Sequence, residues 1–144
     1  MKKVLFALLA LTMVFALAAC GQDAAPADDG AASPEDVVAQ TLEQYIIGAY
    51  PDVVEEVAPT QIKVYTADEI AANEALQTYD LKDGDIVFEA NYDLKIVDGI
   101  DDLTQYTAAT GEIDGQWIRN KFQLGIVRDN GDGTYTMDAF GTGW

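Results

Sequence analysis

The chain has 144 residues, of which 49% are apolar, and its formal charge is −17 with no histidine. This length suggests a single domain, and the apolar content argues against disorder across the whole chain. The acidic charge argues against nucleic acid as a partner and against electrostatic attraction to anionic lipids. The absence of histidine excludes imidazole as a general base or metal ligand. A lone cysteine excludes an internal disulfide.

The first 20 residues have the organisation of an export signal. Met1-Lys2-Lys3 is followed by an uncharged apolar run over 4–19, which is short for a bilayer-spanning helix. The run ends in Leu17-Ala18-Ala19-Cys20, which resembles the lipobox of bacterial lipoproteins at all four positions. The resemblance implies a diacylglycerol thioether on Cys20 and cleavage after Ala19. The alternative is an ordinary signal peptide with an incidental cysteine.

These boundaries divide the chain into a lipoprotein signal peptide (1–19), a flexible acidic tether (20–33) and one folded domain (34–144). The tether contains Pro26, three aspartates and no large apolar residue, so it cannot bury enough surface to fold. Six basic and 25 acidic residues remain after the signal, which gives a charge of −19. The expected location is the extracytoplasmic face of the cell membrane, with the lipid on Cys20 as the attachment.

The folded domain is expected to begin with an amphipathic helix. Residues 33–36 (Ser-Pro-Glu-Asp) combine a capping serine, a proline suited to the first helical position and two acids. Apolar residues then recur at helical spacing at Val38, Leu42, Tyr45 and Ala49, and Pro51 stops the helix after Tyr50. This predicts about four turns.

The segment between this helix and residue 85 gives weaker signals. Pro59 interrupts 53–66, so that only Ile62–Thr66 is predicted as a short strand. Residues 68–76 predict a second, shorter helix capped near Thr66, with Ile70 and Ala71 turned inward.

Three strands are expected in the C-terminal part. Residues 86–96 alternate between an apolar face and a polar face that carries Glu89, Asn91, Asp93 and Lys95. An acidic connection over 98–115 leads to a strand over 117–128. Its buried face is expected to hold Ile118, Phe122, Leu124 and Ile126, with Trp117, Arg119, Lys121 and Gln123 opposite. A hairpin turn at 130–133 leads to a last strand over 134–140.

This order predicts an α+β fold with one long N-terminal helix packed on an antiparallel sheet of three to four strands. The arrangement resembles cystatin-like folds and, with fewer helices before the sheet, NTF2-like folds. It is also similar to small uncharacterised lipoproteins that carry runs like residues 111–117, Gly-Glu-Ile-Asp-Gly-Gln-Trp. The resemblance transfers no functional motif.

Charged and aromatic residues on the polar faces have two interpretations. Arg119 and Lys121 share the polar face of one strand, and Glu89, Asp93 and Lys95 share that of another. If the two strands are neighbours, opposite charges are expected to pair across them and so help to set the register. The alternative is an interaction surface centred on Trp117. The terminal Trp144 could dock into a partner or fold back onto its own sheet.

Metal binding and catalysis have few candidates. Asp98, Asp101 and Asp102 could offer oxygen ligands to calcium, but their spacing does not match a calcium loop, so a solvated loop is expected. Tyr45 and Tyr92 could point into a cone between helix and sheet, as in NTF2-like enzymes, but no acid is expected beside them. The sequence therefore predicts no catalytic residue, no metal site and no cofactor.

The hypothesis that follows is a membrane-anchored, non-catalytic lipoprotein whose domain binds an envelope or secreted protein. One alternative is a small-ligand carrier with an aromatic cavity between helix and sheet. The other is an NTF2-like enzyme.

Overall fold

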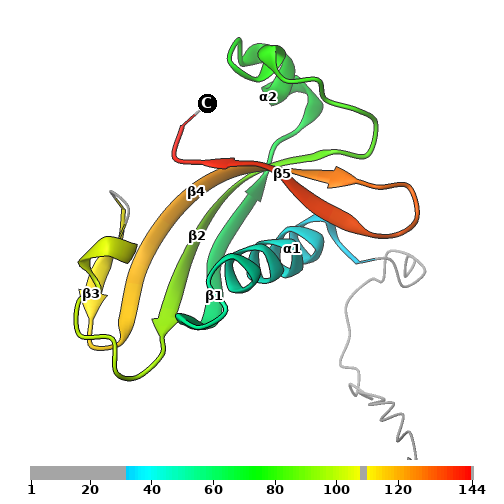
Figure 1. Cartoon of the computed structure of the whole chain (residues 1–144). Coiled ribbons are helices and arrows are strands. Elements are labelled where there is room, and N and C mark those ends of the chain that lie inside the picture. Colours follow the sequence, from blue (N-terminus) through cyan, green and yellow to red (C-terminus); the bar gives the residue numbers. More distant parts are fainter. Residues whose placement is uncertain (1–31, 108–109, 144) are drawn as a thin grey trace, which may run out of the picture. The chain divides into compact units, whose positions relative to one another are not determined.

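A computed structural model of the chain describes residues 32–107 and 110–143 (Figure 1). It has an α+β fold in which one main helix and several short helical turns accompany an antiparallel sheet. The described elements are α1 (Pro34–Ala49), β1 (Val54–Val64), α2 (Ala67–Ala72), η1 (Leu76–Thr78), β2 (Ile86–Ile96), η2 (Thr104–Tyr106), β3 (Glu112–Asp114), β4 (Trp117–Asp129) and β5 (Tyr135–Gly141).

The sheet has five strands rather than the expected three to four. Its order is β1-β2-β4-β3, and β5 also pairs with β4. β3 pairs with residues 117–119 of β4, and β5 pairs with residues 124–129 of the same edge. Residues 120–123 between these pairings have neither neighbour, so β4 has a gap in the middle of its outer edge.

α1 begins where the sequence predicts. The Ser33 hydroxyl accepts a hydrogen bond from the Asp36 amide, and the Asp36 carboxylate accepts one from the Ser33 amide, which satisfies two free donors of the first turn. The helix ends before Pro51. Figure 1 shows α1 lying across one face of the sheet. Its buried side chains are Val37, Val38, Thr41, Leu42 and Ile46.

The main core lies between α1 and this face. Alternate residues of β2 point into it, as their period of two predicts. Buried members from the strands include Val54, Val57, Phe88, Ala90, Tyr92, Leu94, Ile96, Ile118 and Val127.

β1 is longer than the expected strand over 62–66, because Pro59 does not break it. Among the described strands β1 pairs with β2 alone, so its other side is an edge of this sheet, at which a missing backbone N–H is tolerated. The pairing shifts between Pro59 and Gln61, which absorbs the irregularity. The expected connection over 98–115 was also incomplete, since it contains the three-residue strand β3.

A β-bulge divides β4 into two halves. Asn120 has a φ of 56°, in the left-handed region that asparagine tolerates better than most residues. At this point Asp93 of β2 faces two residues of β4, Arg119 and Asn120. The Asp93 carboxylate accepts hydrogen bonds from the Asn120 amide at 2.9 Å and the Arg119 guanidinium at 2.8 Å. One acidic side chain therefore holds the bulge in place.

The bulge reverses the alternation of β4, so the predicted faces are wrong beyond Asn120. Lys121 and Gln123, predicted on the polar face, are buried on the α1 side, where they pair with Tyr92 and Ala90. Residues Phe122, Leu124 and Ile126 turn to the other side of the sheet. Only Ile118, before the bulge, keeps its predicted place in the main core.

The opposite face of the sheet is covered in part by α2 and η1. Leu76, Val87 and Ile126 form a second, smaller buried cluster there. Thr66 caps α2 as expected, but the helix ends at Ala72, and Ala71 is exposed rather than turned inward.

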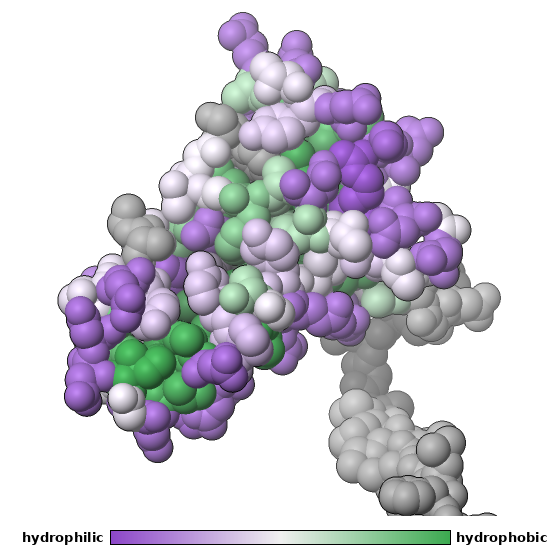
Figure 2. All heavy atoms as spheres, viewed as in Figure 1, coloured by the Kyte–Doolittle hydropathy of each residue, from purple (hydrophilic) through white to green (hydrophobic). Residues whose placement is uncertain are grey.

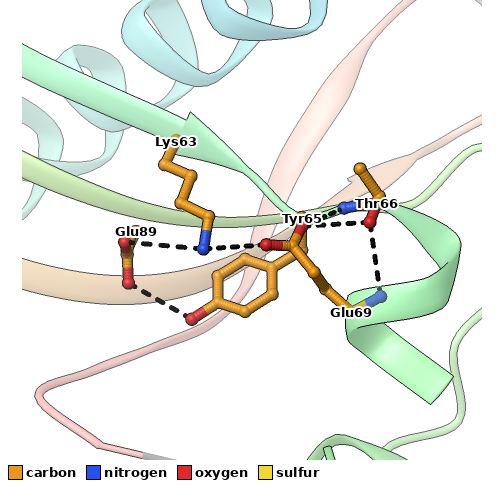
Figure 3. A network of polar contacts seen from close by, with 5 residues as sticks. All are labelled: Lys63, Tyr65, Thr66, Glu69 and Glu89. Carbon is orange, nitrogen blue, oxygen red and sulfur yellow. Dashed lines mark hydrogen bonds and ion pairs between the residues drawn. The ribbon is translucent and has the colours of Figure 1, made fainter. Parts of the chain in front are cut away.

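Polar contacts tie the start of α2 to the sheet (Figure 3). Lys63 of β1 lies between Glu69 of α2, at 3.0 Å, and Glu89 of β2, at 4.0 Å. The Tyr65 hydroxyl donates to Glu89 at 3.2 Å, and Glu69 also accepts from the Thr66 amide. These bonds fix α2 at the end of β1.

Candidate functional site

A pocket of about 390 Å³ lies between α1 and the sheet. This volume is within the range of about 300–1,000 Å³ typical of small-molecule sites. The lining comes from α1, β1, β2, β4, β5 and the η2 turn. The lining residues are Tyr45, Ile46, Ala49, Tyr50, Val54, Tyr92, Leu94, Gln105, Tyr106, Lys121, Gln123 and Phe140.

Aromatic side chains form two walls of the pocket. The Tyr45 ring meets Phe140 edge to face with centroids 5.1 Å apart, and Tyr50 meets Tyr106 in the same way at 6.5 Å. Tyr45 and Tyr50 are 43% and 51% exposed, so they mark the mouth of the pocket. The α1 periodicity predicts Tyr45 and Ala49 on the sheet side, but both are exposed and line the pocket instead of joining the core.

Lys121 of β4 lines this pocket and is only 3% exposed. Its ammonium group donates hydrogen bonds to the backbone carbonyls of Tyr106 at 2.8 Å and Thr107 at 2.7 Å. The chain after η2 can approach because neither β3 nor β5 pairs with β4 here. The Thr110 hydroxyl also accepts from the Phe122 amide in this gap. Burial lowers the pKa of Lys121.

Tyr92 lies opposite Lys121 in the register and is almost fully buried. Burial raises the pKa of the Tyr92 hydroxyl to about 12, although a hydrogen bond from the Gln123 side chain opposes the rise. Tyr92 therefore stays protonated at neutral pH. Gln123 is 8% exposed, and its side-chain carbonyl oxygen has no hydrogen-bond partner among the residues that the structure describes.

The chemistry of the lining favours binding. None of the twelve lining residues is acidic, so the pocket offers a buried ammonium, tyrosine hydroxyls and amide groups among apolar walls. A general base with a pKa near neutrality is a usual requirement of acid–base catalysis. The lining offers no carboxylate for that role.

The structure does contain a buried carboxylate that the sequence interpretation missed. The Asp85 side chain is almost fully buried, and the Arg128 guanidinium lies 3.0 Å from it. The Lys82 amide donates to the same oxygen at 2.9 Å. Asp85 does not line the pocket, and its ion pair gives it a structural role beside the β2–β4 ladder.

Trp117 lies on the polar face of the sheet, as expected. The Arg119 guanidinium stacks over its ring at 4.2 Å and pairs with Asp93 across the strands. The predicted pairing is therefore confirmed for Arg119 and wrong for Lys121. Lys95 pairs with Glu55 of β1 instead of with β4.

A small apolar patch is visible near β3 in the space-filling view (Figure 2). Ile113 of β3 is the exposed large apolar residue of this strand. It borders a shallow hollow together with Ile100 and with Asp101 and Asp102 of the acidic loop. Asp102 accepts hydrogen bonds from the amide and hydroxyl of Thr104, which orders the turn before η2.

Two predicted site residues, Cys20 and Trp144, lie outside the described residues. Within 32–107 and 110–143, no helix is long and apolar enough to cross a membrane. The same ranges contain no group of three or more histidine, cysteine, aspartate or glutamate side chains that could hold a metal ion.

Lys121 and Gln123 are the pocket residues that sequence reasoning misplaced. The available signal was Asn120, because asparagine is enriched at positive φ and such a residue inside a strand marks a bulge. No protein-family model, curated protein or solved structure matches this chain.

Proposed function

We propose that this protein is an extracytoplasmic lipoprotein, anchored through lipid on Cys20, whose domain binds a small ligand between α1 and the sheet. The observation that carries the proposal is the pocket of about 390 Å³ with tyrosines at its mouth and Lys121 at its wall. Of the sequence-based hypotheses, the small-ligand carrier with an aromatic cavity fits this geometry best.

The proposal describes the domain as cystatin-like. A single long helix laid across an antiparallel sheet is the arrangement expected of that fold, and the pocket lies between these two layers. The order of elements, with the helix before the strands of the sheet, supports this description.

Binding is favoured over catalysis by the composition of the pocket. A carrier needs apolar and aromatic walls with a few polar groups that orient the ligand. The lining offers these features without a carboxylate beside Tyr92. A carrier at a membrane surface would hold its ligand near the bilayer through the tether over 20–33.

The binding test is a fragment screen by two-dimensional NMR on the full chain in lipid nanodiscs, with empty nanodiscs as the background. The expected result is a set of fragments that shift amide signals of the pocket residues. Ala49→Trp should block these shifts, because Ala49 lines the pocket. Gly48→Trp is the matched control, because a side chain there meets open space. Fragments that bind elsewhere, or none that bind, would overturn the carrier.

The anchoring has a separate test. Replacing Cys20 by alanine should abolish labelling of the expressed chain with a fatty-acid analogue and release it from the membrane fraction. Labelling that persists in Cys20→Ala would contradict the lipid attachment without affecting the pocket.

A further inference from the structure

Lys121 differs from every other basic side chain that the structure describes. Lys63, Lys95, Arg119 and Arg128 each form an ion pair with a carboxylate. Lys82 has no ion pair but is exposed to solvent. Within 32–107 and 110–143, Lys121 alone is buried and has no carboxylate partner, although acids outnumber bases threefold in the chain.

The described contacts satisfy only part of the hydrogen-bonding capacity and none of the charge of the Lys121 ammonium. An ammonium has three N–H donors, and two of them point to the carbonyls of Tyr106 and Thr107. The carbonyls are dipoles, so they stabilise the charge without neutralising it. A buried charge is costly unless an opposite charge and full hydrogen bonding compensate it. The third N–H and the missing negative charge point to an anion in the pocket.

A second unpaired group lies on the same wall. Gln123 is two residues from Lys121 on the same face of β4, so their Cα atoms are about 7 Å apart. Its side-chain oxygen is buried and accepts no hydrogen bond from any described residue. A ligand that satisfies both groups carries a negatively charged acceptor and, close to it, a hydrogen-bond donor such as a hydroxyl.

On these grounds we propose that the ligand is a small monocarboxylate with an apolar or aromatic body. This inference rests on the proposed ligand-binding function and specifies its ligand class. The carboxylate would pair with Lys121, a neighbouring hydroxyl would donate to Gln123, and the body would lie against Tyr45, Tyr50 and Phe140.

The charge of the pocket favours a monoanion over a phosphate ester. Lys121 is the only basic side chain in the lining, and a single positive charge balances one negative charge. A dianion would leave an excess negative charge in a pocket with apolar walls, inside a domain that is already strongly acidic. Because the lining contains no acidic residue, a bound carboxylate is not repelled by a neighbouring carboxylate.

The test compares matched acids and alcohols on the full chain in nanodiscs. The probes are benzoate, 2-naphthoate and 4-phenylbutyrate, each paired with the primary alcohol that has the same carbon skeleton. Dissociation constants come from NMR titration of the pocket signals. The expected result is that at least one acid binds about tenfold more tightly than its alcohol, the factor expected of one charge-assisted hydrogen bond. A further probe, 2-hydroxy-4-phenylbutyrate, carries a hydroxyl on the carbon beside the carboxylate. It should bind more tightly than 4-phenylbutyrate if this hydroxyl donates to Gln123, and equal affinity would overturn that contact.

Two variants assign the preference to Lys121. Lys121→Met should reduce the acid to the affinity of its alcohol while the alcohol keeps its own affinity, which shows that the pocket is intact. Lys82→Met removes an exposed lysine without an ion pair and should leave the preference unchanged. If Lys121→Met does not fold, the acid–alcohol comparison in the unmodified chain still decides the ligand class.

The outcomes separate the two proposals. Equal affinity for acids and alcohols at the pocket would overturn the carboxylate ligand and leave the carrier in place. A preference that survives in Lys121→Met would overturn the role of Lys121. If no probe binds and the wider fragment screen also fails, both proposals are overturned.

Discussion

The two faces of the sheet bury their apolar side chains in different ways. On one face α1 covers a large core that is hollowed by a pocket and contains a buried lysine and glutamine. On the other face α2 and η1 cover a small apolar cluster, and the rest of that face carries surface ion pairs. Strand β4 supplies residues to both, and the bulge at Asn120 decides which residues go to which face.

This difference suits the two faces to different roles: the α2 face stabilises the fold, and the α1 face carries the proposed binding site. The cluster around Leu76 closes the end of the sheet that holds α2, and the buried Asp85 carboxylate before β2 is paired with Arg128. The α1 face holds the Lys121 ammonium without a described carboxylate partner and the Gln123 side-chain oxygen without a described hydrogen-bond partner, and both cost free energy in the unliganded protein. Residues that destabilise a fold while lining a pocket are typical of binding sites.

The largest expected effect contrasts the two cores. Leu42 and Leu76 are both fully buried, and Leu→Ala in a core costs about 2–5 kcal/mol of unfolding free energy. We expect about 4 kcal/mol for Leu42→Ala in the α1 core and about 2 kcal/mol for Leu76→Ala in the smaller cluster. Chemical denaturation measures both losses.

Hydrogen exchange sharpens this contrast. Leu76→Ala should accelerate exchange mainly in α2 and η1, because their packing on the sheet depends on Leu76. Leu42→Ala should accelerate exchange throughout the sheet. Equal loss of protection in α1 for the two variants would contradict the separation of the cores.

The next effect concerns Gly125, which lies opposite Phe88. A Cβ atom at Gly125 would lie 2.5 Å from the Phe88 ring, so Gly125→Ala must displace that ring from the α1 core. We expect a loss of about 2–3 kcal/mol in thermal or chemical unfolding. Gly48→Ala is the control, because its side chain meets open space and alanine favours the helix by up to about 1 kcal/mol. Equal stability of the two variants would contradict the close approach.

The bulge itself can be loosened through Asp93. Asp93→Ala removes the acceptor for the Asn120 amide and the partner of Arg119, and we expect a loss of about 2 kcal/mol. Asp138→Ala removes an exposed partner of Arg128 and should cost less than about 1 kcal/mol. Amide shifts of Lys121 should change only in Asp93→Ala. Unchanged shifts there would show that the bulge does not depend on this carboxylate.

The smallest effect is a pH dependence on the α2 side. The Thr66 amide and the Lys63 ammonium lower the pKa of Glu69 from 4.5 to about 2. Its contribution to stability is therefore full above about pH 4.5 and is lost as the pH falls toward 2. Glu69→Gln should flatten this part of the stability profile and leave the pocket signals unchanged. An identical acid profile for Glu69→Gln would contradict the assignment.

Local sequence signals predict an element correctly where a single preference, such as helix capping or strand alternation, determines it. The capping residues Ser33 and Thr66 marked both helix starts, and the alternation over 86–96 identified β2. The prediction is wrong where the position of a residue in the sheet overrides its local preference. The sequence predicts that Pro59 breaks the strand, but the proline is tolerated because β1 lies at an edge of the described sheet.

The residues of the candidate site could not be predicted because of the bulge at Asn120, which the apolar pattern of β4 does not reveal. Phe122, Leu124 and Ile126 alternate as a buried face should, but they lie on the face of the sheet opposite α1. There Ile126 joins the cluster around Leu76, and Phe122 is only half-buried. The same bulge placed Lys121 and Gln123 against α1. Periodicity shows that the side chains of a strand alternate. It does not show that an inserted residue has exchanged the two faces of the strand.

The edge position of Pro59 also has a consequence for the protein at high local concentration. An open strand edge offers a row of backbone groups to which another chain can add a strand, and this is a route to aggregation. β1 lacks one donor at Pro59, has an irregular register beside it, and carries exposed Glu55 and Glu56. Copies held side by side would repel one another at this edge, which opposes the addition of one copy's strand to the next.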